Sequence, residues 1–134
     1  MKRLWGVFLI VGVCLSPAAN AGDNHLGVWS GALTEMIVAG KRYERYRVTI
    51  TVTPRKYRID YDTLECGGEL RLLQHRGRFY RFRDELKYGL KNCQNGGRTE
   101  IHFIDSEQAT FQWFDKRGVL KVEGQLKKQA QMMI

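Results

Sequence analysis

Serine and cysteine, which supply most enzymatic nucleophiles, are scarce in this chain of 134 residues. Beyond the first 21 residues the only serines are Ser30 and Ser106, and two of the three cysteines remain, Cys66 and Cys93. Nucleophilic catalysis needs a serine, threonine or cysteine beside a base and a third, orienting group, and the sequence contains no such motif and no nucleophile elbow. We therefore predict no catalytic residue and a binding protein rather than an enzyme.

Metal-ligand spacing is also missing. The histidines His25, His75 and His102 are scattered along the chain, with no His-x-x-x-His pair among them. Cys66 and Cys93 are 27 positions apart and have no histidine pair nearby. We expect solvated surface histidines, no metal and no cofactor.

Paired carboxylates occur at Asp60 and Asp62 and at Asp84 and Glu85. Glycosidases use a pair of carboxyl groups as acid and base or nucleophile, so an enzyme that acts on cell-wall or other glycan material is one possible function. It is the least favoured of the functions considered below. Both pairs are interleaved with arginines, so ion pairing on a solvated sheet explains them better.

Long apolar runs are absent after the N-terminus. There, Lys2 and Arg3 precede an apolar stretch at residues 4–15, and Ala19-Asn20-Ala21 follows as a small-x-small cleavage site. This pattern predicts a secretory signal peptide over residues 1–21, cleaved near Ala21, and a periplasmic or secreted mature chain. The stretch is shorter than the roughly 20 residues of a membrane-spanning helix, so we expect no transmembrane segment in the mature chain.

The signal sequence also changes the cysteine count. A lipoprotein would acylate a cysteine such as Cys14, but Val13 stands where a lipobox needs a small residue, so we expect Cys14 to leave with the signal. An even pair in an oxidising compartment predicts a disulfide between Cys66 and Cys93. The chain-entropy model assigns such a loop of about 28 residues roughly 3.6 kcal/mol of stabilisation.

Helical periodicity is weak throughout, and we expect at most a short turn around Glu85 to Leu90. Alternation with period two dominates instead: Tyr46, Val48, Ile50 and Val52 alternate with arginines and threonines. With turn residues between them, such segments predict about eight short strands, at residues 28–37, 45–53, 57–62, 70–72, 79–83, 99–103, 111–113 and 120–126.

The fold class is therefore all-β. We predict a single domain over residues 22–134, an antiparallel meander of about eight strands closed as a small barrel with one disulfide. Closure removes the exposed edges that template aggregation, and a sandwich is the alternative. Residues 127–134 are expected to form a frayed tail.

Two short motifs resemble known families. The run Tyr61-Asp62-Thr63-Leu64-Glu65-Cys66-Gly67-Gly68 resembles a Tyr-x-x-Leu-x-Cys-Gly-Gly motif of small exported bacterial β-domains, with Cys93 as the second cysteine. Many members of that uncharacterised group carry Pro-Ser where this chain has Asp62-Thr63. The resemblance covers roughly residues 57–113 and supports the fold and the disulfide without implying an activity. Gly27-Val28-Trp29-Ser30-Gly31 is similar to the Gly-x-Trp opening of lipocalin-like and avidin-like barrels.

Basic residues are the strongest functional signal. The formal net charge is +8, and removing Lys2 and Arg3 lowers it to about +6. Neighbouring strands of a meander place arginines on one outer face, which would attract an anionic envelope component or another envelope or extracellular protein. Nucleic acid is an unlikely partner outside the cytoplasm. The candidate partner-binding residues are Arg45, Arg47, Arg58, Arg71, Arg81 and Arg83; a solubilising surface is the alternative.

The sequence thus favours a non-enzymatic interaction protein, for instance an inhibitor or immunity-type module that uses its basic face or its loops. The second hypothesis is a lipocalin-like carrier that holds a small ligand inside the barrel, although small barrels are often filled by their own side chains. The candidate cavity residues are Trp29, Tyr46, Phe79, Phe103, Phe111 and Trp113.

Overall fold

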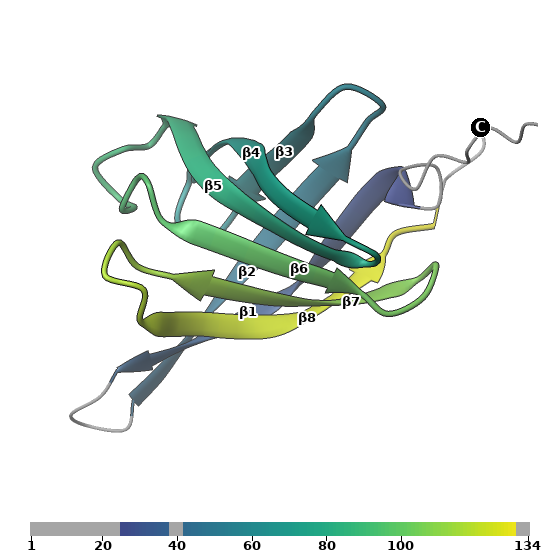
Figure 1. Cartoon of the computed structure of the whole chain (residues 1–134). Coiled ribbons are helices and arrows are strands. Elements are labelled where there is room, and N and C mark those ends of the chain that lie inside the picture. Colours follow the sequence, from purple (N-terminus) through teal and green to yellow (C-terminus); the bar gives the residue numbers. More distant parts are fainter. Residues whose placement is uncertain (1–24, 38–41, 131–134) are drawn as a thin grey trace, which may run out of the picture.

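The chain folds as a closed barrel of eight antiparallel strands in sequence order (Figure 1). A computed structural model describes residues 25–37 and 42–130. The strands are β1 (Gly27–Ile37), β2 (Arg42–Val52), β3 (Tyr57–Tyr61), β4 (Cys66–Arg76), β5 (Phe79–Tyr88), β6 (Arg98–Phe103), β7 (Gln108–Phe114) and β8 (Leu120–Lys128). Because β1 pairs with both β2 and β8, the hydrogen bonding runs around the whole barrel and the predicted closed meander is confirmed. The sandwich alternative is excluded.

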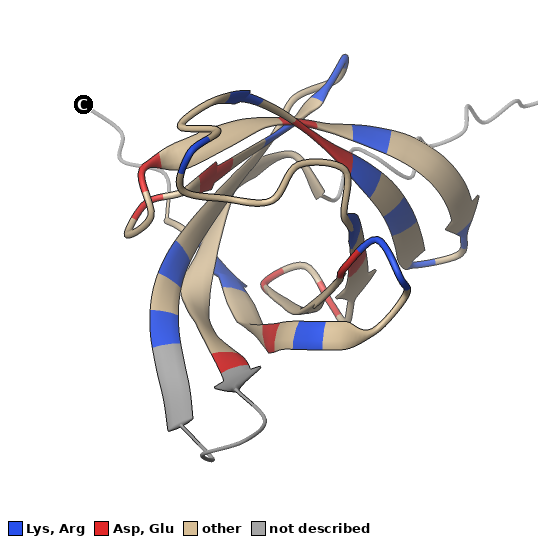
Figure 2. Cartoon of the chain, turned by 90° about the vertical axis from the view of Figure 1, so that its left-hand side faces the viewer, with Lys and Arg blue, Asp and Glu red and all other residues tan. Residues whose placement is uncertain are grey.

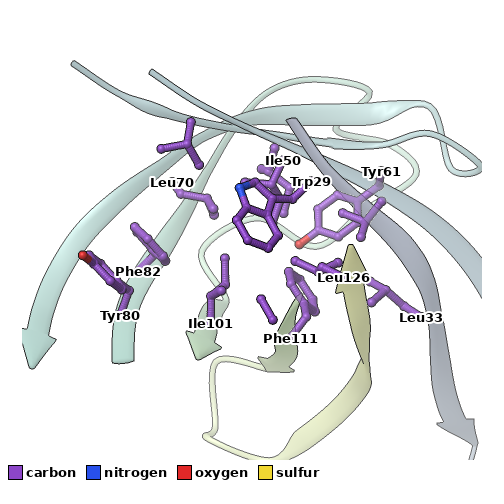
Figure 3. Packing of buried hydrophobic residues seen from close by; sticks show 14 of the residues in the cluster. Trp29, Leu33, Ile50, Tyr61, Leu70, Tyr80, Phe82, Ile101, Phe111 and Leu126 are labelled. Atoms are coloured by element: carbon purple, nitrogen blue, oxygen red, sulfur yellow. The ribbon is translucent and has the colours of Figure 1, made fainter. Parts of the chain in front are cut away.

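The core follows from the period-two pattern, since every second side chain of each strand points inward. Trp29 lies at its centre and is fully buried, with side chains of the surrounding strands directed toward it (Figure 3). Its indole N–H donates a hydrogen bond of 2.9 Å to the His25 carbonyl oxygen, which satisfies the one polar atom of the ring. The other large, fully buried side chains include Tyr80, Phe82, Phe103, Phe111, Leu33 and Ile101.

The two ends of the barrel differ. One end carries the turns at residues 53–56, 77–78 and 104–107 and is capped by His25, whose ring stacks on Phe103 at a centroid distance of 3.9 Å. We call this the capped end. The other end carries the loops at residues 62–65, 89–97 and 115–119, and we call it the loop end.

The seam between β1 and β8 depends on glycine. A Cβ atom at Gly31 would lie 2.0 Å from the carbonyl oxygen of Gln125, and one at Gly124 would lie 2.5 Å from that of Ala32. No real Cβ tolerates such contacts, so only glycine allows the two backbones to approach closely enough to pair. The seam in turn closes the barrel.

The predicted disulfide joins Cys66, the first residue of β4, to Cys93 in the loop between β5 and β6, with 6.4 Å between their Cα atoms. The crosslink thus ties the longest described loop of the loop end to the barrel wall. The expectation of at most a short turn around Glu85 to Leu90 agrees with the structure, where β5 continues to Tyr88 and pairs there with Gly67 of β4. Within residues 85–93, the turn is confined to residues 90–92.

The chain ends differ from expectation where they are described. Lys127 and Lys128 belong to β8, and the Gln129 backbone N–H donates to the Val28 carbonyl at 2.7 Å, so fraying does not begin at residue 127. Residues 131–134 lie outside the described part of the chain, as do residues 1–24 with the predicted signal peptide and Cys14. Within the described ranges, no helix has the length and apolar character needed to cross a membrane.

Removing the disulfide should destabilise the barrel without changing its fold. We expect the Cys66→Ala/Cys93→Ala variant to lose roughly 3–4 kcal/mol of unfolding free energy, because the unfolded chain regains the entropy of an open loop. Urea denaturation measures the loss. A reducing agent should lower the stability of the unmodified protein by a similar amount and leave the variant unaffected; equal sensitivity of both would contradict the assignment.

Substitution at the seam should cost more than substitution beside it. We expect Gly31→Ala to lower the unfolding free energy by roughly 2 kcal/mol, since the strands must separate to admit the methyl group. The control is Ala32→Ser at the neighbouring, exposed position of β1, which should change stability by less than about 0.5 kcal/mol. Equal melting temperatures for the two variants would show that the seam accepts side chains.

Candidate functional site

A cavity of about 330 Å³ lies at the loop end of the barrel. This volume is at the lower end of the range, about 300–1,000 Å³, that small-molecule sites occupy. Six strands and the crosslinked loop, through Cys93, contribute to its walls. Lining side chains from the strands include Glu35, Tyr46, Tyr61, Asp84, Trp113 and Val122.

The cavity begins where the inward side chains change from apolar to polar. On β1 the inward series runs from Trp29 and Leu33 to Glu35, and on β5 it runs through Phe82 to Asp84. Apolar packing therefore fills the barrel from the capped end to its middle, and toward the loop end polar side chains interrupt it, with Leu86 inward again beyond Asp84. The polar layer that follows forms the floor and walls of the cavity.

Asp84 lies in the floor and is 1% exposed. The Tyr61 hydroxyl donates to its Oδ2 at 2.8 Å, and the Thr99 hydroxyl donates to its Oδ1 at 2.5 Å. The Trp113 side chain makes a third hydrogen bond to the carboxylate, for which its indole N–H is the donor. A buried carboxylate needs such donors, and here three residues from three other strands supply them.

Burial raises the pKa of Asp84 to about 6, although the hydrogen bonds from Thr99, Tyr61 and Trp113 act in the opposite direction. The pKa of Tyr61 is also raised, first by burial and then by the neighbouring Asp84 charge, so its hydroxyl stays protonated and remains a donor. Near neutral pH the floor of the cavity therefore carries a negative charge held by neutral partners.

The Trp113 ring is held in place by the loop that contains the disulfide. A Cβ atom at Gly97 would lie 2.5 Å from Trp113 Nε1, so the indole packs directly over the backbone there. The Gly97 carbonyl accepts a hydrogen bond from the Asp84 backbone N–H at 2.9 Å, which fixes the loop to β5. Asn95 adds a second tie, because its Oδ1 accepts from the Leu86 N–H at 2.9 Å.

The rim of the cavity carries both signs of charge. Asp115 begins the loop between β7 and β8, and its Oδ1 accepts hydrogen bonds from the backbone N–H groups of Arg117 and Val119. Its Oδ2 lies 4.0 Å from the Lys121 ammonium. Arg117 and Lys121 both line the cavity, and they lie at its mouth on the loop and the start of β8.

The structure separates the predicted cavity residues into three groups. Tyr46 and Trp113 line the cavity, as the sequence suggests. Trp29, Phe103 and Phe111 do not, since they are buried in the packed core. Phe79 lies on the outward side of β5, where the Arg81 guanidinium is 5.7 Å from its ring centroid.

The predicted arginines lie on the outer surface but are mixed with carboxylates. Figure 2 faces the loop end and shows acidic and basic residues interspersed around the barrel. Arg58 pairs with Asp60 at 3.1 Å, Arg71 with Glu85 at 3.4 Å and Arg81 with Glu100 at 3.0 Å.

Arg83 lies opposite Arg71 on β4 and Arg98 on β6, while Arg45 and Arg47 are exposed on β2. A role for these arginines in partner binding remains a prediction.

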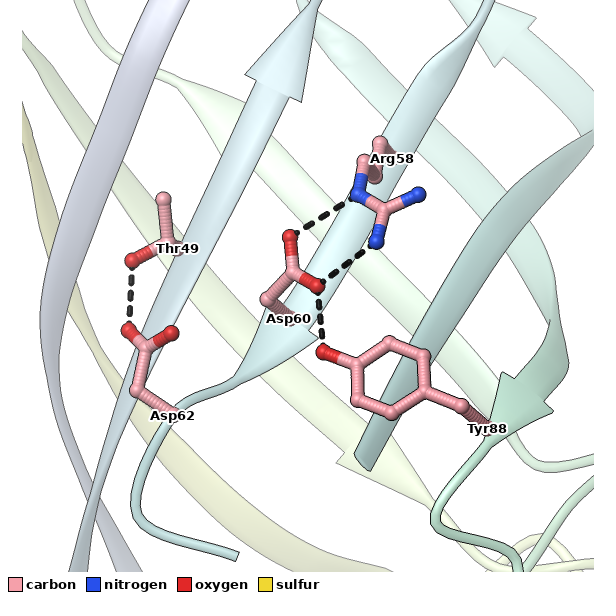
Figure 4. A network of polar contacts seen from close by, with 5 residues as sticks. All are labelled: Thr49, Arg58, Asp60, Asp62 and Tyr88. Carbon is pink, nitrogen blue, oxygen red and sulfur yellow. Dashed lines mark hydrogen bonds and ion pairs between the residues drawn. The ribbon is translucent and has the colours of Figure 1, made fainter. Parts of the chain in front are cut away.

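Asp60 and Asp62 share the outer face, as expected of residues two apart in a strand (Figure 4). Asp60 accepts hydrogen bonds from Arg58 and from the Tyr88 hydroxyl, and Asp62 accepts one from the Thr49 hydroxyl at 2.6 Å. Solvated ion pairing is thus confirmed for Asp60, whereas none of the ion pairs among the described residues includes Asp62. The prediction is wrong for Asp84, which points inward and forms no ion pair with any described residue.

The histidines also divide. His75 and His102 are exposed, but His25 is buried against Phe103, so the expected solvated position is wrong for it. Burial lowers the pKa of His25, with the nearby Lys128 as the second cause. In the described part of the chain, no three histidine, cysteine or acidic side chains are grouped so that they could hold a metal ion.

Sequence reasoning missed Asp84 and Tyr61 as cavity residues, although the pattern contained the signal. In the series Tyr80, Phe82, Asp84 and Leu86, the acidic residue occupies an inward position between large apolar ones. An acidic residue at an inward position of a strand is either buried among hydrogen-bond donors or faces an internal cavity. Asp84 does both.

No protein-family model, curated protein or solved structure matches this chain. The functional argument therefore rests on the chemistry of the cavity.

Asp84 should make the protein less stable as the pH rises. Its pKa is about 6 in the folded state and near 3.8 when unfolded, so the folded state binds the proton more tightly. Its contribution should fall by about 3 kcal/mol as the pH rises from about 4 to above 6, and stay constant beyond. The difference in unfolding free energy between the Asp84→Asn variant and the unmodified protein should therefore increase in favour of the variant by this amount as the pH rises.

Urea denaturation at a series of pH values measures the difference between the two proteins. Thr99→Val should widen the effect, because it removes a donor that favours the ionised carboxylate. Parallel stability curves for the unmodified protein and Asp84→Asn would contradict the raised pKa.

Proposed function

We propose that this chain is an exported binding protein that holds a small ligand in the cavity at the loop end of its barrel. One observation carries the proposal: the packed core stops below a cavity of about 330 Å³, whose walls combine aromatic side chains with a buried charged floor. A cavity lined by aromatic side chains with a few converging polar groups is typical of small-molecule sites. Export and a periplasmic or secreted location come from the sequence and belong to the same proposal.

The alternative of an inhibitor or immunity-type interaction module has weaker support. Three of its six candidate arginines are paired with carboxylates, which reduces the net field that an anionic partner would meet. A docking surface on the loops remains compatible with the same fold.

A glycan-acting enzyme has weaker support still. A raised pKa suits a general acid, but a general acid must reach the leaving group with its proton. Asp84 is 1% exposed and both its oxygens already accept hydrogen bonds from side chains, so it presents no free carboxyl to a substrate.

Fragment screening of the exported protein by NMR tests the proposal. The two tryptophans of the described chain supply an internal comparison, since the Trp113 indole N–H lies at the cavity and the Trp29 indole N–H lies in the core. We expect binding fragments to shift the Trp113 signal and its cavity neighbours and to leave the Trp29 signal unchanged.

A blocking variant sharpens the test. Leu64 lines the cavity, whereas Leu90 is 54% exposed in the next loop and does not line it. Leu64→Trp should weaken fragment binding by at least roughly tenfold, and Leu90→Trp should leave it unchanged. Fragments that bind only at other surfaces, or that bind equally to both variants, would overturn the proposal.

A further inference from the structure

Among the described residues, no positively charged side chain forms an ion pair with Asp84. Its donors Tyr61, Thr99 and Trp113 are neutral. A buried carboxylate without a countercharge is costly to maintain. Since the residue lies in the floor of an open cavity, the missing positive charge is one that a ligand can supply.

The hydrogen bonds of Asp84 restrict which cation fits. Both carboxylate oxygens already accept hydrogen bonds from side chains, and only 1% of the residue is exposed. Its charge therefore acts on the cavity, although little of the carboxylate is open to a ligand donor. A primary amine brings three N–H donors that each need an acceptor. A quaternary ammonium group needs none, and therefore matches the buried, already hydrogen-bonded carboxylate of Asp84.

The walls beside the floor suit the same group. Tyr46, Tyr61 and Trp113 line the cavity on β2, β3 and β7, which places aromatic rings on different sides of it. The faces of such rings attract cations, and surrounding aromatic rings are the common protein device for binding quaternary ammonium ligands. Glu35 adds a second carboxylate from β1 to the lining.

Two side chains at the rim attract negative charge, whereas the floor attracts positive charge. Arg117 and Lys121 line the mouth, with Asp115 beside Lys121. A ligand with a cationic end at the floor would bring its other end to these side chains. An anionic group there would gain from both, since a guanidinium and an ammonium each bind carboxylate.

We propose that the cavity binds a small zwitterion, with a quaternary ammonium group at the floor among Tyr46, Tyr61 and Trp113 and a carboxylate at the rim near Arg117 and Lys121. This inference rests on the proposed function, because it names the ligand class of the same cavity.

Four small compounds of similar shape test each charge separately. Glycine betaine carries both charges, choline only the positive one, 3,3-dimethylbutanoate only the negative one and 3,3-dimethylbutanol neither. Titration of the exported protein at pH 7.5, followed by the Trp113 indole signal, measures the four affinities. We expect betaine to bind at least roughly tenfold more tightly than 3,3-dimethylbutanoate, and choline to exceed 3,3-dimethylbutanol by a similar factor.

Variants of the chain assign these preferences to residues. Asp84→Asn should reduce the affinity for betaine and choline by roughly tenfold and leave that for 3,3-dimethylbutanoate unchanged or improved. Lys121→Gln should reduce the affinity for betaine more than the affinity for choline. Lys116→Gln is the matched control, because it removes the same charge from the same end of the barrel at a residue outside the cavity lining.

The comparison of compounds does not depend on whether Asp84→Asn folds. Equal binding of each ammonium compound and its carbon isostere would overturn the cation site. Equal binding of betaine and choline would overturn the zwitterion. If none of the four shifts Trp113 while unrelated fragments do, the ligand class is wrong and the cavity keeps its proposed function; if nothing shifts Trp113, both fail.

Discussion

The pairing of β1 with β8 is the constraint on which the rest of this structure depends. It joins the first strand of the described chain to the last and so converts an open meander into a barrel without free edges. The strands meet only because Gly31 and Gly124 have no side chains at the point of closest approach. Once the barrel is closed, every inward side chain must be accommodated in a space of limited width, and its chemistry decides whether that space is filled or hollow.

The interior of the barrel is filled at the capped end and hollow at the loop end. Large aromatic side chains fill the part between the capped end and the middle, with Trp29 at the centre. Toward the loop end the inward positions carry Glu35 and Asp84, which cannot pack against apolar neighbours without partners. The disulfide from Cys66 to Cys93 and the hydrogen bond from the Asp84 N–H to Gly97 hold the crosslinked loop over this region. The loop therefore shapes the cavity and supports the Trp113 ring in its wall.

The fold could be predicted because alternation is a local property. A strand such as residues 46–52 shows in its own sequence which side chains face inward, and eight such segments separated by turns leave few possible topologies. The predicted use of the aromatic residues was less accurate, since Trp29 and Trp113 both have inward positions in the pattern. Whether an inward residue lies in the core or in the cavity depends on its distance from the loop end. That distance is set by the register of all eight strands.

The sequence by itself determined the strand pattern and the all-β class, because alternation is set by residue spacing. It also left Cys66 and Cys93 as the single pair of cysteines outside the predicted signal peptide. Only the tertiary structure decided that Asp84 is buried and has no ion-pair partner among the described residues. Beside Glu85 and three nearby arginines in the sequence it resembles a surface ion-pair residue. The strand phase turns it inward, and closure of the barrel brings Tyr61, Thr99 and Trp113 to it from other strands. Those long-range contacts hold its charge beneath a cavity, and no local pattern contains them.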